Sequence, residues 1–386
     1  MSLYKSASGR EVNAHSYSGG IEFKFCRRKY QLHRIVGWVE KGKHAALELG
    51  KCLESAIQYY HENGLKPGDC VEEWKRLWLK FSDIEMTYTS QEDNWASIYR
   101  VGTDWAKLYE ILLPTLPIRN PKFQLEYRKE VFAGTGLEFL SYVDMLTTAE
   151  DGSRAVVDIK SAKMSLDVEP NLLSLDPQLR RYAWITGIRD VAFLWFVKAK
   201  PNSYKKGTAV TLLEDEAGFK AGDSLVVYKT EVQQEEDGAD LLQVTLSQPE
   251  TIQKMEEELD KISGKGSKEA KEKIIARYFE EKLLFVVDGP SVTNTRLQYV
   301  KATIPAEDMD EIGDSIGQEM ILIKDAADKG KFPKDGGVRW PNNQCTFCKY
   351  RGICLKDSNL RDQFLTQIKK ADSDDWLREL ETEEVE

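Results

Sequence analysis

The sequence predicts an α/β protein whose core is a mixed β-sheet flanked by helices. Three observations support this fold class: the first third of the chain has apolar residues at helical spacing, residues 123–161 alternate like strands, and a capped helix then precedes a strongly apolar strand. Helices packed around strands that run in both directions are typical of such a sheet.

The expected helices follow from apolar spacing and from capping residues. The segments with helical spacing in the first third are 42–61, 71–81 and 94–113. A further helix is expected at 176–187, because Asp176 suits the N-cap, Pro177 suits the first helical position and Gly187 suits the C-terminal end.

The expected strands are short segments bounded by turn residues. Those of the core are 123–132, 137–148, 155–161 and 191–198. Gly134 and Gly136 mark the first turn and an Asp-Gly pair marks the second, so the first three strands form a meander.

Residues 201–305 have a looser pattern, which we interpret largely as an insertion. Strands are expected near 208–213, 225–230, 241–246 and 295–303, and one long charged helix from 249 to about 284. The sequence has no internal repeat and no long Pro, Gly or Ser linker, so a single domain is expected over 15–371. Its core would comprise about 42–200 and 292–356, the insertion about 201–291, and an acidic tail 372–386.

Composition and charge exclude several classes of protein. The 386 residues include 64 acidic and 54 Lys or Arg residues, a formal charge of −10, which excludes a generally basic protein that coats nucleic acid. Of this charge, −7 belongs to residues 372–386, whereas segment 24–34 has five Lys and Arg residues and no acid. No apolar stretch suits a membrane span or a secretory signal, so we expect a cytoplasmic protein without a membrane partner.

Two acids and a lysine fall on neighbouring strands. Side chains alternate along a strand, so Asp158 and Lys160 share one face. If the turn is centred on Asp151, Asp144 lies opposite Asp158, whereas a two-residue loop would shift this pairing by one residue. Adjacent carboxylates favour a hard cation such as Mg²⁺, which can activate water for phosphodiester hydrolysis while Lys160 orients it. The alternative is a pair of surface strands on which Lys160 and Asp158 form an ordinary contact between side chains on one face of the sheet, with no catalytic role.

One face of the helix at 176–187 carries polar groups. Gln178 and Tyr182 are four residues apart and Arg181 is three from Gln178, so this face can present an amide, a phenol and a guanidinium to a nucleic-acid backbone. The alternative is a solvated helix face.

Three of the six cysteines lie in the sequence CTFCKYRGIC, as Cys345, Cys348 and Cys354. This spacing in a chain without a secretion signal indicates a metal or iron-sulfur site before a disulfide. A 4Fe-4S cluster or a structural zinc requires four ligands, and Cys26 is the best fourth because Arg27 would favour its thiolate. Zinc in this site, or three unrelated buried cysteines, are the alternatives. The remaining two, Cys52 and Cys70, suit small apolar positions in helices.

In this order the motifs resemble those of the RecB-type nucleases of the PD-(D/E)XK superfamily. The narrower resemblance is to the iron-sulfur subgroup, which includes CRISPR-associated exonucleases and the AddB nuclease domain. That pattern has an N-terminal Cys, G-x-x-x-H-E, an Asp, D/E-x-K, Q-x-x-x-Y and three C-terminal cysteines. The matching residues are Cys26, Gly50–Ser55, Asp144, Asp158–Lys160, Gln178 with Tyr182, and Cys345, Cys348 and Cys354.

The resemblance implies a restriction-endonuclease-like core with a helical N-terminal part and an iron-sulfur-stapled C-terminus. Asp144, Asp158 and the backbone carbonyl of Ile159 would bind Mg²⁺ or Mn²⁺, and Lys160 would act on the attacking water. The four cysteines would hold a 4Fe-4S cluster. By the same resemblance, Gln178 and Tyr182 would contact DNA near the cut. Arg181 is added from its place on the same helix, and Arg27 and Arg28 from the positive charge of segment 24–34.

Glu54 stands where the family has a metal-binding histidine. A carboxylate is a good ligand for Mg²⁺ or Mn²⁺, and many nucleases of the wider superfamily use one from this helix. We therefore include Glu54 among the catalytic and metal-binding residues. The alternative is a plain polar residue on the helix.

These features together predict a metal-dependent deoxyribonuclease that acts on single-stranded DNA or DNA ends, most simply as an exonuclease in repair, recombination or phage replication. The sequence has no G-x-x-x-x-G-K-[ST] motif, so unwinding would need a helicase, recombination or replication partner. The alternatives are a DNA-binding or assembly protein that does not cleave, and a zinc-stabilised restriction-like endonuclease.

Overall fold

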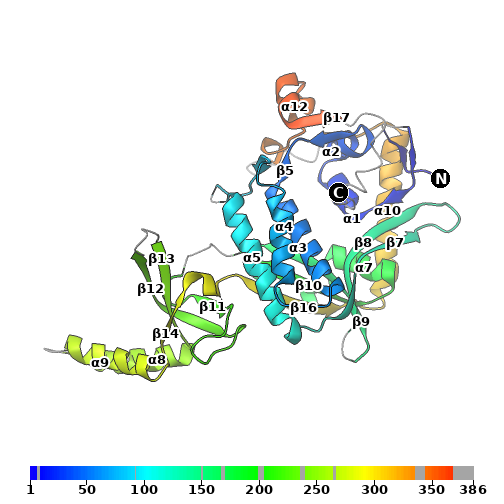
Figure 1. Ribbon diagram of the computed structural model, residues 1–386. Helices are drawn as coiled ribbons and strands as arrows, with labels where there is room; N and C mark the ends of the chain where they lie inside the picture. Colours follow the sequence, from blue (N-terminus) through cyan, green and yellow to red (C-terminus); the bar gives the residue numbers. More distant parts are fainter. Residues whose placement is uncertain are drawn as a thin grey trace.

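A computed structural model describes residues 1–6, 9–91, 93–148, 151–166, 170–198, 204–234, 240–263, 267–334 and 344–367. The acidic tail predicted at 372–386 lies outside these residues. The described chain forms an α/β core from which a smaller β-sheet and two helices project to one side (Figure 1).

The core is built on a six-stranded mixed sheet, as predicted. Its strands are β3 (Ala14–His15), β7 (Arg119–Glu130), β8 (Glu138–Thr148), β9 (Arg154–Ala162), β10 (Asp190–Val197) and β16 (Arg296–Thr303). The strand order is β16-β10-β9-β8-β3, with β7 also paired to β8. The β9–β10 and β3–β8 pairs are parallel and the others antiparallel. The N-terminal segment thus contributes a strand to the core, which the sequence pattern did not indicate.

Three helices cover one face of the sheet: α3 (Ala45–Glu62), α4 (Asp69–Leu79) and α5 (Trp95–Leu112). Their apolar residues form one core with strand residues such as Val157 and Ile159, and Trp74, Trp78 and Trp105 are its largest fully buried side chains. Helix α5 begins at an Asn94 capping box, close to the predicted boundary.

The opposite face is covered by α7 (Pro177–Thr186) and α10 (Asp308–Asp328). Asp176 caps α7 by accepting hydrogen bonds from two backbone N–H groups, and Gly187 ends the helix in the left-handed conformation with φ of 72°. These caps are the predicted ones. The sequence pattern did not predict α10, which is the longest helix in the described part of the chain.

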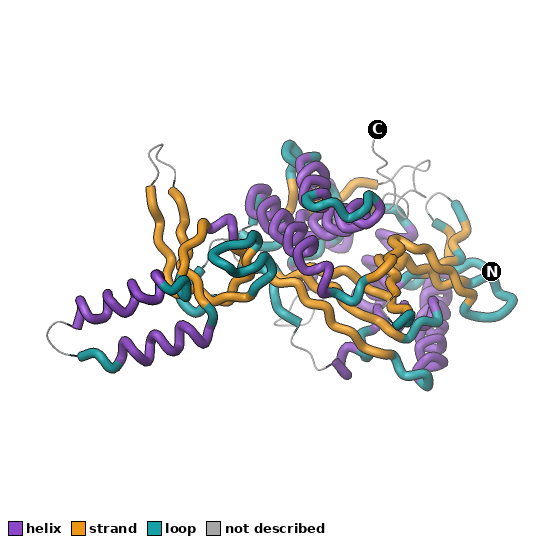
Figure 2. Tube along the Cα trace, turned by 60° about the horizontal axis from the view of Figure 1, so that its bottom comes forward, coloured by secondary structure: helices purple, strands orange, loops and turns teal. Residues whose placement is uncertain are grey.

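The projecting part has its own five-stranded antiparallel sheet, with strand order β14-β13-β12-β11-β15. Its elements are β11 (Ala209–Leu212), β12 (Ser224–Gln234), β13 (Asp240–Ser247), α8 (Pro249–Asp260), α9 (Ser267–Glu280), β14 (Phe285–Asp288) and β15 (Val292–Thr293). Figure 2 shows α8 and α9 side by side at the end away from the core. This sheet has a separate apolar core, and it corresponds to the segment that the sequence assigns to an insertion.

The prediction of one long helix from 249 to about 284 is wrong. The chain forms two helices, α8 and α9, and β14 begins at Phe285. Tyr278 and Leu284 pack against Met255, so the two helices bury apolar surface against each other. A single continuous helix would leave that surface in water, and the two glycines between the helices weaken helical continuity.

The two ends of the described chain lie side by side. The N-terminal elements are β1 (Tyr4–Lys5), β2 (Glu11–Val12), α1 (Tyr17–Phe25), α2 (Arg27–Tyr30), a π-helical turn (Gln31–Ile35), β4 (Trp38–Glu40) and β5 (Lys43–His44), which pairs with β6 (Met86–Thr87). The C-terminal elements are α11 (Arg351–Leu355), α12 (Ser358–Phe364) and β17 (Leu365–Gln367). Elsewhere in the chain, the short helix α6 (Pro170–Leu173) precedes α7. Strands β4 and β17 pair antiparallel, so the C-terminal segment is anchored on the N-terminal one.

Candidate active site

The candidate site lies where β8 and β9 separate. Their backbone pairing ends at Met145 and Val157, in the predicted register that places Asp144 opposite Asp158. Beyond this point a side chain replaces the backbone ladder: the Ile159 N–H donates to Asp144 Oδ2 over 2.9 Å. The separation therefore leaves room for two carboxyl groups between adjacent strands.

Asp158 is fully buried and lies at the centre of the site. Its Oδ1 accepts hydrogen bonds from Lys160 Nζ at 3.0 Å and from Gln178 Nε2 at 2.8 Å. Its Oδ2 lies 2.8 Å from Lys160 Nζ but accepts no hydrogen bond from the described residues. A buried carboxylate oxygen without a hydrogen bond is costly, and a bound cation is one way to satisfy it.

Glu54 reaches the same site from α3. Its Oε2 accepts a hydrogen bond of 3.3 Å from Gln124 Nε2 on β7. The charges of Glu54 and of the two aspartates act on one another's pKa values, which shows that the three acids are electrostatic neighbours. The structure thus brings together the four residues predicted to be catalytic, and Gln124 joins them without any signal in the sequence pattern.

Gln178 and Tyr182 hold Asp158 from α7. The Gln178 amide donates to Asp158 Oδ1 and, over 2.9 Å, to the Tyr182 hydroxyl. Tyr182 is only 4% exposed, so in this structure its hydroxyl supports Gln178. A DNA contact by either residue stays a prediction.

The prediction that Arg181 faces DNA is wrong. Arg181 is 5% exposed, and its two terminal nitrogens donate to the Glu319 carboxylate at 3.2 and 3.0 Å. Its neighbour Arg180 is paired with Asp308 at 2.7 Å. Arg181 and Tyr182 flank Gln178 on opposite sides, about 100° apart around the helix, so Arg181 reaches Glu319 on α10 while Tyr182 contacts Gln178. The positive charge expected from this helix is therefore neutralised within the fold.

Without a metal, the three acids keep protons to a higher pH than ordinary carboxyl groups, because the pKa of each is raised. Burial, and then the charge of Glu54, raise the pKa of Asp144 to about 7. Burial, and then the charge of Asp144, raise the pKa of Asp158 to about 8, and burial with the charge of Asp158 raises that of Glu54 to about 7. Burial opposes the charge of Lys160, but the surrounding carboxylates outweigh it and raise its pKa.

This donor set fits a divalent cation. Once ionised, three carboxylates against one lysine leave an excess of negative charge for a cation to offset, and oxygen ligands are those that Mg²⁺ and Mn²⁺ prefer. In the arrangement shown, Lys160 neutralises Asp158. No group of three or more His, Cys, Asp or Glu side chains in the described ranges is already arranged to hold a metal ion. Binding would therefore require these side chains to adjust.

Metal binding should stabilise the protein more at high pH than at low pH. Raised carboxyl pKa values mean that the stability contributed by the protonated acids is present at about pH 4 and is lost as pH rises to about 8. A divalent cation replaces the lost protons, so saturating Mn²⁺ is expected to raise Tm by about 3 °C or more at pH 8 and by much less at pH 5.5. Thermal unfolding with Mn²⁺ or EDTA measures this. An equal Mn²⁺ shift in Asp158→Asn would contradict the site.

Four cysteines line one open pocket of about 620 Å³. They are Cys26, Cys345, Cys348 and Cys354. The other two cysteines, Cys52 and Cys70, are buried in helices α3 and α4, as predicted. The structure thus places Cys26 beside the C-terminal group, although Cys26 and Cys345 are 319 positions apart in the sequence.

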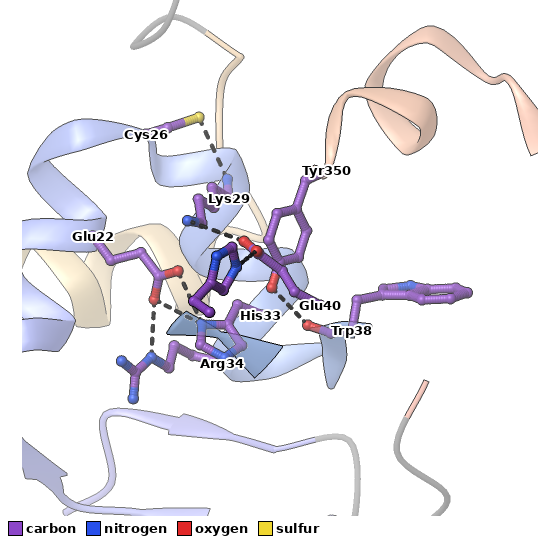
Figure 3. Close-up of polar contacts among 9 residues, drawn as sticks. Glu22, Cys26, Lys29, His33, Arg34, Trp38, Glu40 and Tyr350 are labelled. Atoms are coloured by element: carbon purple, nitrogen blue, oxygen red, sulfur yellow. Dashed lines mark hydrogen bonds and ion pairs between the residues drawn. The ribbon is translucent and has the colours of Figure 1, made fainter. Parts of the chain in front are cut away.

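The pocket wall is positively charged and joins the two ends of the chain. Lys29, Lys334 and Arg351 line it with the cysteines. Figure 3 shows two contacts of pocket residues: Cys26 Sγ accepts from the Lys29 N–H at 3.4 Å, and the Tyr350 hydroxyl donates to the Trp38 carbonyl at 2.9 Å. The wall is therefore held by hydrogen bonds from both ends of the chain.

The chemistry of this pocket suits a thiolate-bound metal centre. Burial raises the pKa of Cys348 and of Cys354, so both are thiols unless a metal binds. The surrounding cations would offset the charge of bound thiolates. Arg27 lies over the Phe23 ring at 5.3 Å and Arg28 donates to Gln31. A DNA contact by these two arginines stays a prediction.

The sequence matches the PD-(D/E)XK nuclease superfamily over residues 14–355. The chain belongs to this superfamily. The match extends from β3 to α11 and includes both the carboxylate site and the four cysteines. Membership indicates a metal-dependent nuclease with a DNA substrate, in agreement with the fold and the donor set.

Comparison with solved structures adds little to this assignment. The crystal structure of SSO0001 is 13% identical, with 46% of this chain and 70% of that chain covered and a TM-score of 0.19. No curated protein matches the sequence. Within the described part of this superfamily member, no helix is long and apolar enough to cross a membrane.

Proposed function

We propose that this protein is a Mg²⁺- or Mn²⁺-dependent deoxyribonuclease that hydrolyses single-stranded DNA or DNA ends as an exonuclease. The observation that carries the proposal is the convergence of Glu54, Asp144, Asp158 and Lys160 in a buried site, where Lys160 Nζ lies 2.8 Å from Asp158 Oδ2. Superfamily membership supports the hydrolysis of phosphodiester bonds; the exonuclease mode and single-strand preference are our extension.

The residues divide into ligands, a cation and supports. Glu54, Asp144 and Asp158 would hold the metal, with the Ile159 carbonyl as a further oxygen ligand. When bound, the metal supplies a more acidic water and stabilises negative charge on the phosphate. Lys160 keeps its proton because carboxylates surround it, so it donates a hydrogen bond to a phosphate oxygen or to the attacking water and does not act as a base.

Gln178 fixes the orientation of Asp158. The Gln178 side-chain amide donates to the Tyr182 hydroxyl, and the Gln178 backbone N–H donates to the N-cap residue Asp176. These two contacts fix the position of the Gln178 amide before substrate binds. A carboxylate whose one oxygen is occupied by a fixed donor presents the other oxygen in a defined direction. Gln178 and Tyr182 thereby prepare Asp158 for its ligand role.

We also propose that the four cysteines hold a structural 4Fe-4S cluster that ties α2 to the C-terminal helices. The shared pocket and its positive wall support this assignment. We assign no redox step to it. Any unwinding of duplex DNA would fall to a helicase, recombination or replication partner, since the sequence has no nucleotide-binding loop of the Walker type.

The function is tested with protein purified without oxygen and assayed on single strands labelled at the 5′ or the 3′ end. We expect stepwise shortening from one end with Mg²⁺ or Mn²⁺ and none with EDTA. Internal cuts would replace the exonuclease proposal by an endonuclease. DNA binding that survives EDTA without turnover in any metal would favour a protein that does not cleave.

Replacing one pocket cysteine should remove the cluster and lower stability. We expect the wild type to be brown, with broad absorbance near roughly 400 nm and about four iron atoms per chain. Cys348→Ala should lose the colour and the iron and should unfold at lower temperature. Cys52→Ala replaces a buried cysteine outside the pocket and is the matched control. This variant should keep the colour and the iron. A colourless wild type with one zinc would replace the cluster by a zinc site.

A further inference from the structure

Gln124 has an unusual backbone conformation in the middle of strand β7. Its φ is 47°, in the left-handed region that residues other than glycine seldom adopt. The residues on either side keep one register with β8, as Phe123 pairs with Met145 and Leu125 with Val143, but Gln124 itself is left out of the pairing. In the part of β7 that pairs with β8 in one register, from Lys122 to Glu130, the left-handed backbone is confined to Gln124.

Core packing does not account for this conformation. The Gln124 side chain is exposed, so no apolar burial requires its position. The register places Gln124 opposite Asp144, and its amide donates to Glu54 Oε2 over 3.3 Å. Left-handed strain at a residue with a polar side chain persists where surrounding contacts maintain it, and such residues gather at functional sites.

Each acid of the site has one oxygen held by a protein donor. The Ile159 N–H holds Asp144, and the Gln178 amide holds Asp158. Gln124 provides the corresponding donor for Glu54. Carboxylates that bind metals are commonly oriented in this way by hydrogen bonds from a second group.

We propose that Gln124 is a positioning residue that holds the Glu54 carboxylate so that its other oxygen faces a bound divalent cation. A carboxylate ligand needs a hydrogen-bond donor beside it, whereas a histidine ligand needs an acceptor for its second ring nitrogen. The Gln124 amide thus suits a glutamate at this position of α3. This inference rests on the proposed function, because it requires the carboxylate site to bind metal.

The experiment measures Mn²⁺ affinity of the protein by calorimetric titration at pH 8, without DNA. In Gln124→Gly the amide is lost and the left-handed backbone is relieved, so Mn²⁺ affinity should fall about 10-fold while Tm in EDTA is unchanged or higher. Asn120→Gly is the matched control, because Asn120 is on the same strand with φ of 45°. The Mn²⁺ affinity of this variant should stay at the wild-type value. Gln124→Asn, too short to reach Glu54, should lose affinity as well.

A double replacement separates positioning from other effects. In a Glu54→Ala background, Gln124→Gly should cause no further loss of Mn²⁺ affinity, because Gln124 acts through Glu54. Equal affinity of wild type and Gln124→Gly, or the same 10-fold loss in the Glu54→Ala background, would overturn the inference while leaving the proposed function intact. A wild type that binds no Mn²⁺ would overturn both.

Discussion

Replacing Asp158 by asparagine should reduce DNA cleavage by roughly 10³-fold or more without unfolding the protein. The reason is electrostatic: Asp158 supplies a buried negative charge whose Oδ2 has no hydrogen bond in the described structure, and asparagine removes that charge from the cation site. Asparagine resembles the protonated acid, which the fold favours because the pKa of Asp158 is raised to about 8. Activity and stability should therefore change in different directions.

The measurement combines cleavage of a labelled single strand with thermal unfolding in EDTA at pH 8. We expect Asp158→Asn to be inactive and at least as stable as the wild type. Asp151→Asn, in the exposed turn between β8 and β9, is the control and should cleave within about twofold of the wild type, because its contact to the Ser153 N–H can be kept by asparagine. Residual cleavage above a few per cent in Asp158→Asn would show that the metal site is elsewhere.

Replacing Glu319 should cause the largest loss of stability. The Glu319 carboxylate is 3% exposed and contacts His15 at 2.6 Å, Arg181 at 3.0 Å and Lys24 at 2.7 Å. Burial alone would raise the pKa of Glu319, but hydrogen bonds and charges from His15 and Arg181 outweigh it and hold the pKa well below its ordinary range. Removing the carboxylate leaves a buried guanidinium without its partner, a loss of about 3–5 kcal/mol.

Chemical denaturation of Glu319→Ala tests this loss against a matched control on the same helix. Glu311 is 78% exposed and pairs with Arg180 at 3.5 Å, so Glu311→Ala should cost less than about 1 kcal/mol. The stabilisation from Glu319 should persist from neutral pH down through pH 4.5 and disappear only in stronger acid, since its folded pKa lies below the unfolded one. Similar losses in the two variants would contradict a buried ion network.

Gly20 belongs to the same network for a steric reason. A Cβ at this position would lie 1.9 Å from Glu319 Oε1, so a side chain cannot be added without displacing the carboxylate. The network joins α1, which ends beside Cys26, to α7, which carries Gln178. Through Glu319, helix α10 thus contacts both α1, next to the cysteine pocket, and α7, which holds Gln178 against Asp158.

Local signals in the sequence were sufficient for much of the core. The register of β8 and β9 and the caps of α7 follow from alternation and from residues that lie within a few positions of one another. The prediction of one helix from 249 to 284 was wrong because the segment is rich in charged residues, and its few apolar residues contact one another only when α8 and α9 lie side by side. Arg181 was misplaced because helical spacing does not show which side of the helix is buried.

The sequence by itself determined most strands of the core sheet, the capped helix α7, the pairing position of Asp144 and Asp158, and the metal-ligand spacing of the C-terminal cysteines, because each depends on neighbours along the chain; it missed β3 and α10. The tertiary structure brought Cys26, predicted as the fourth ligand, into one pocket with those cysteines, and it alone decided that Arg181 is buried and that Gln124 reaches Glu54. These depend on contacts between distant segments, such as His15 with Glu319 across 304 residues. The local sequence does not show which charged side chains become buried and paired. Arg181, for example, is buried against Glu319 and is therefore part of the fold.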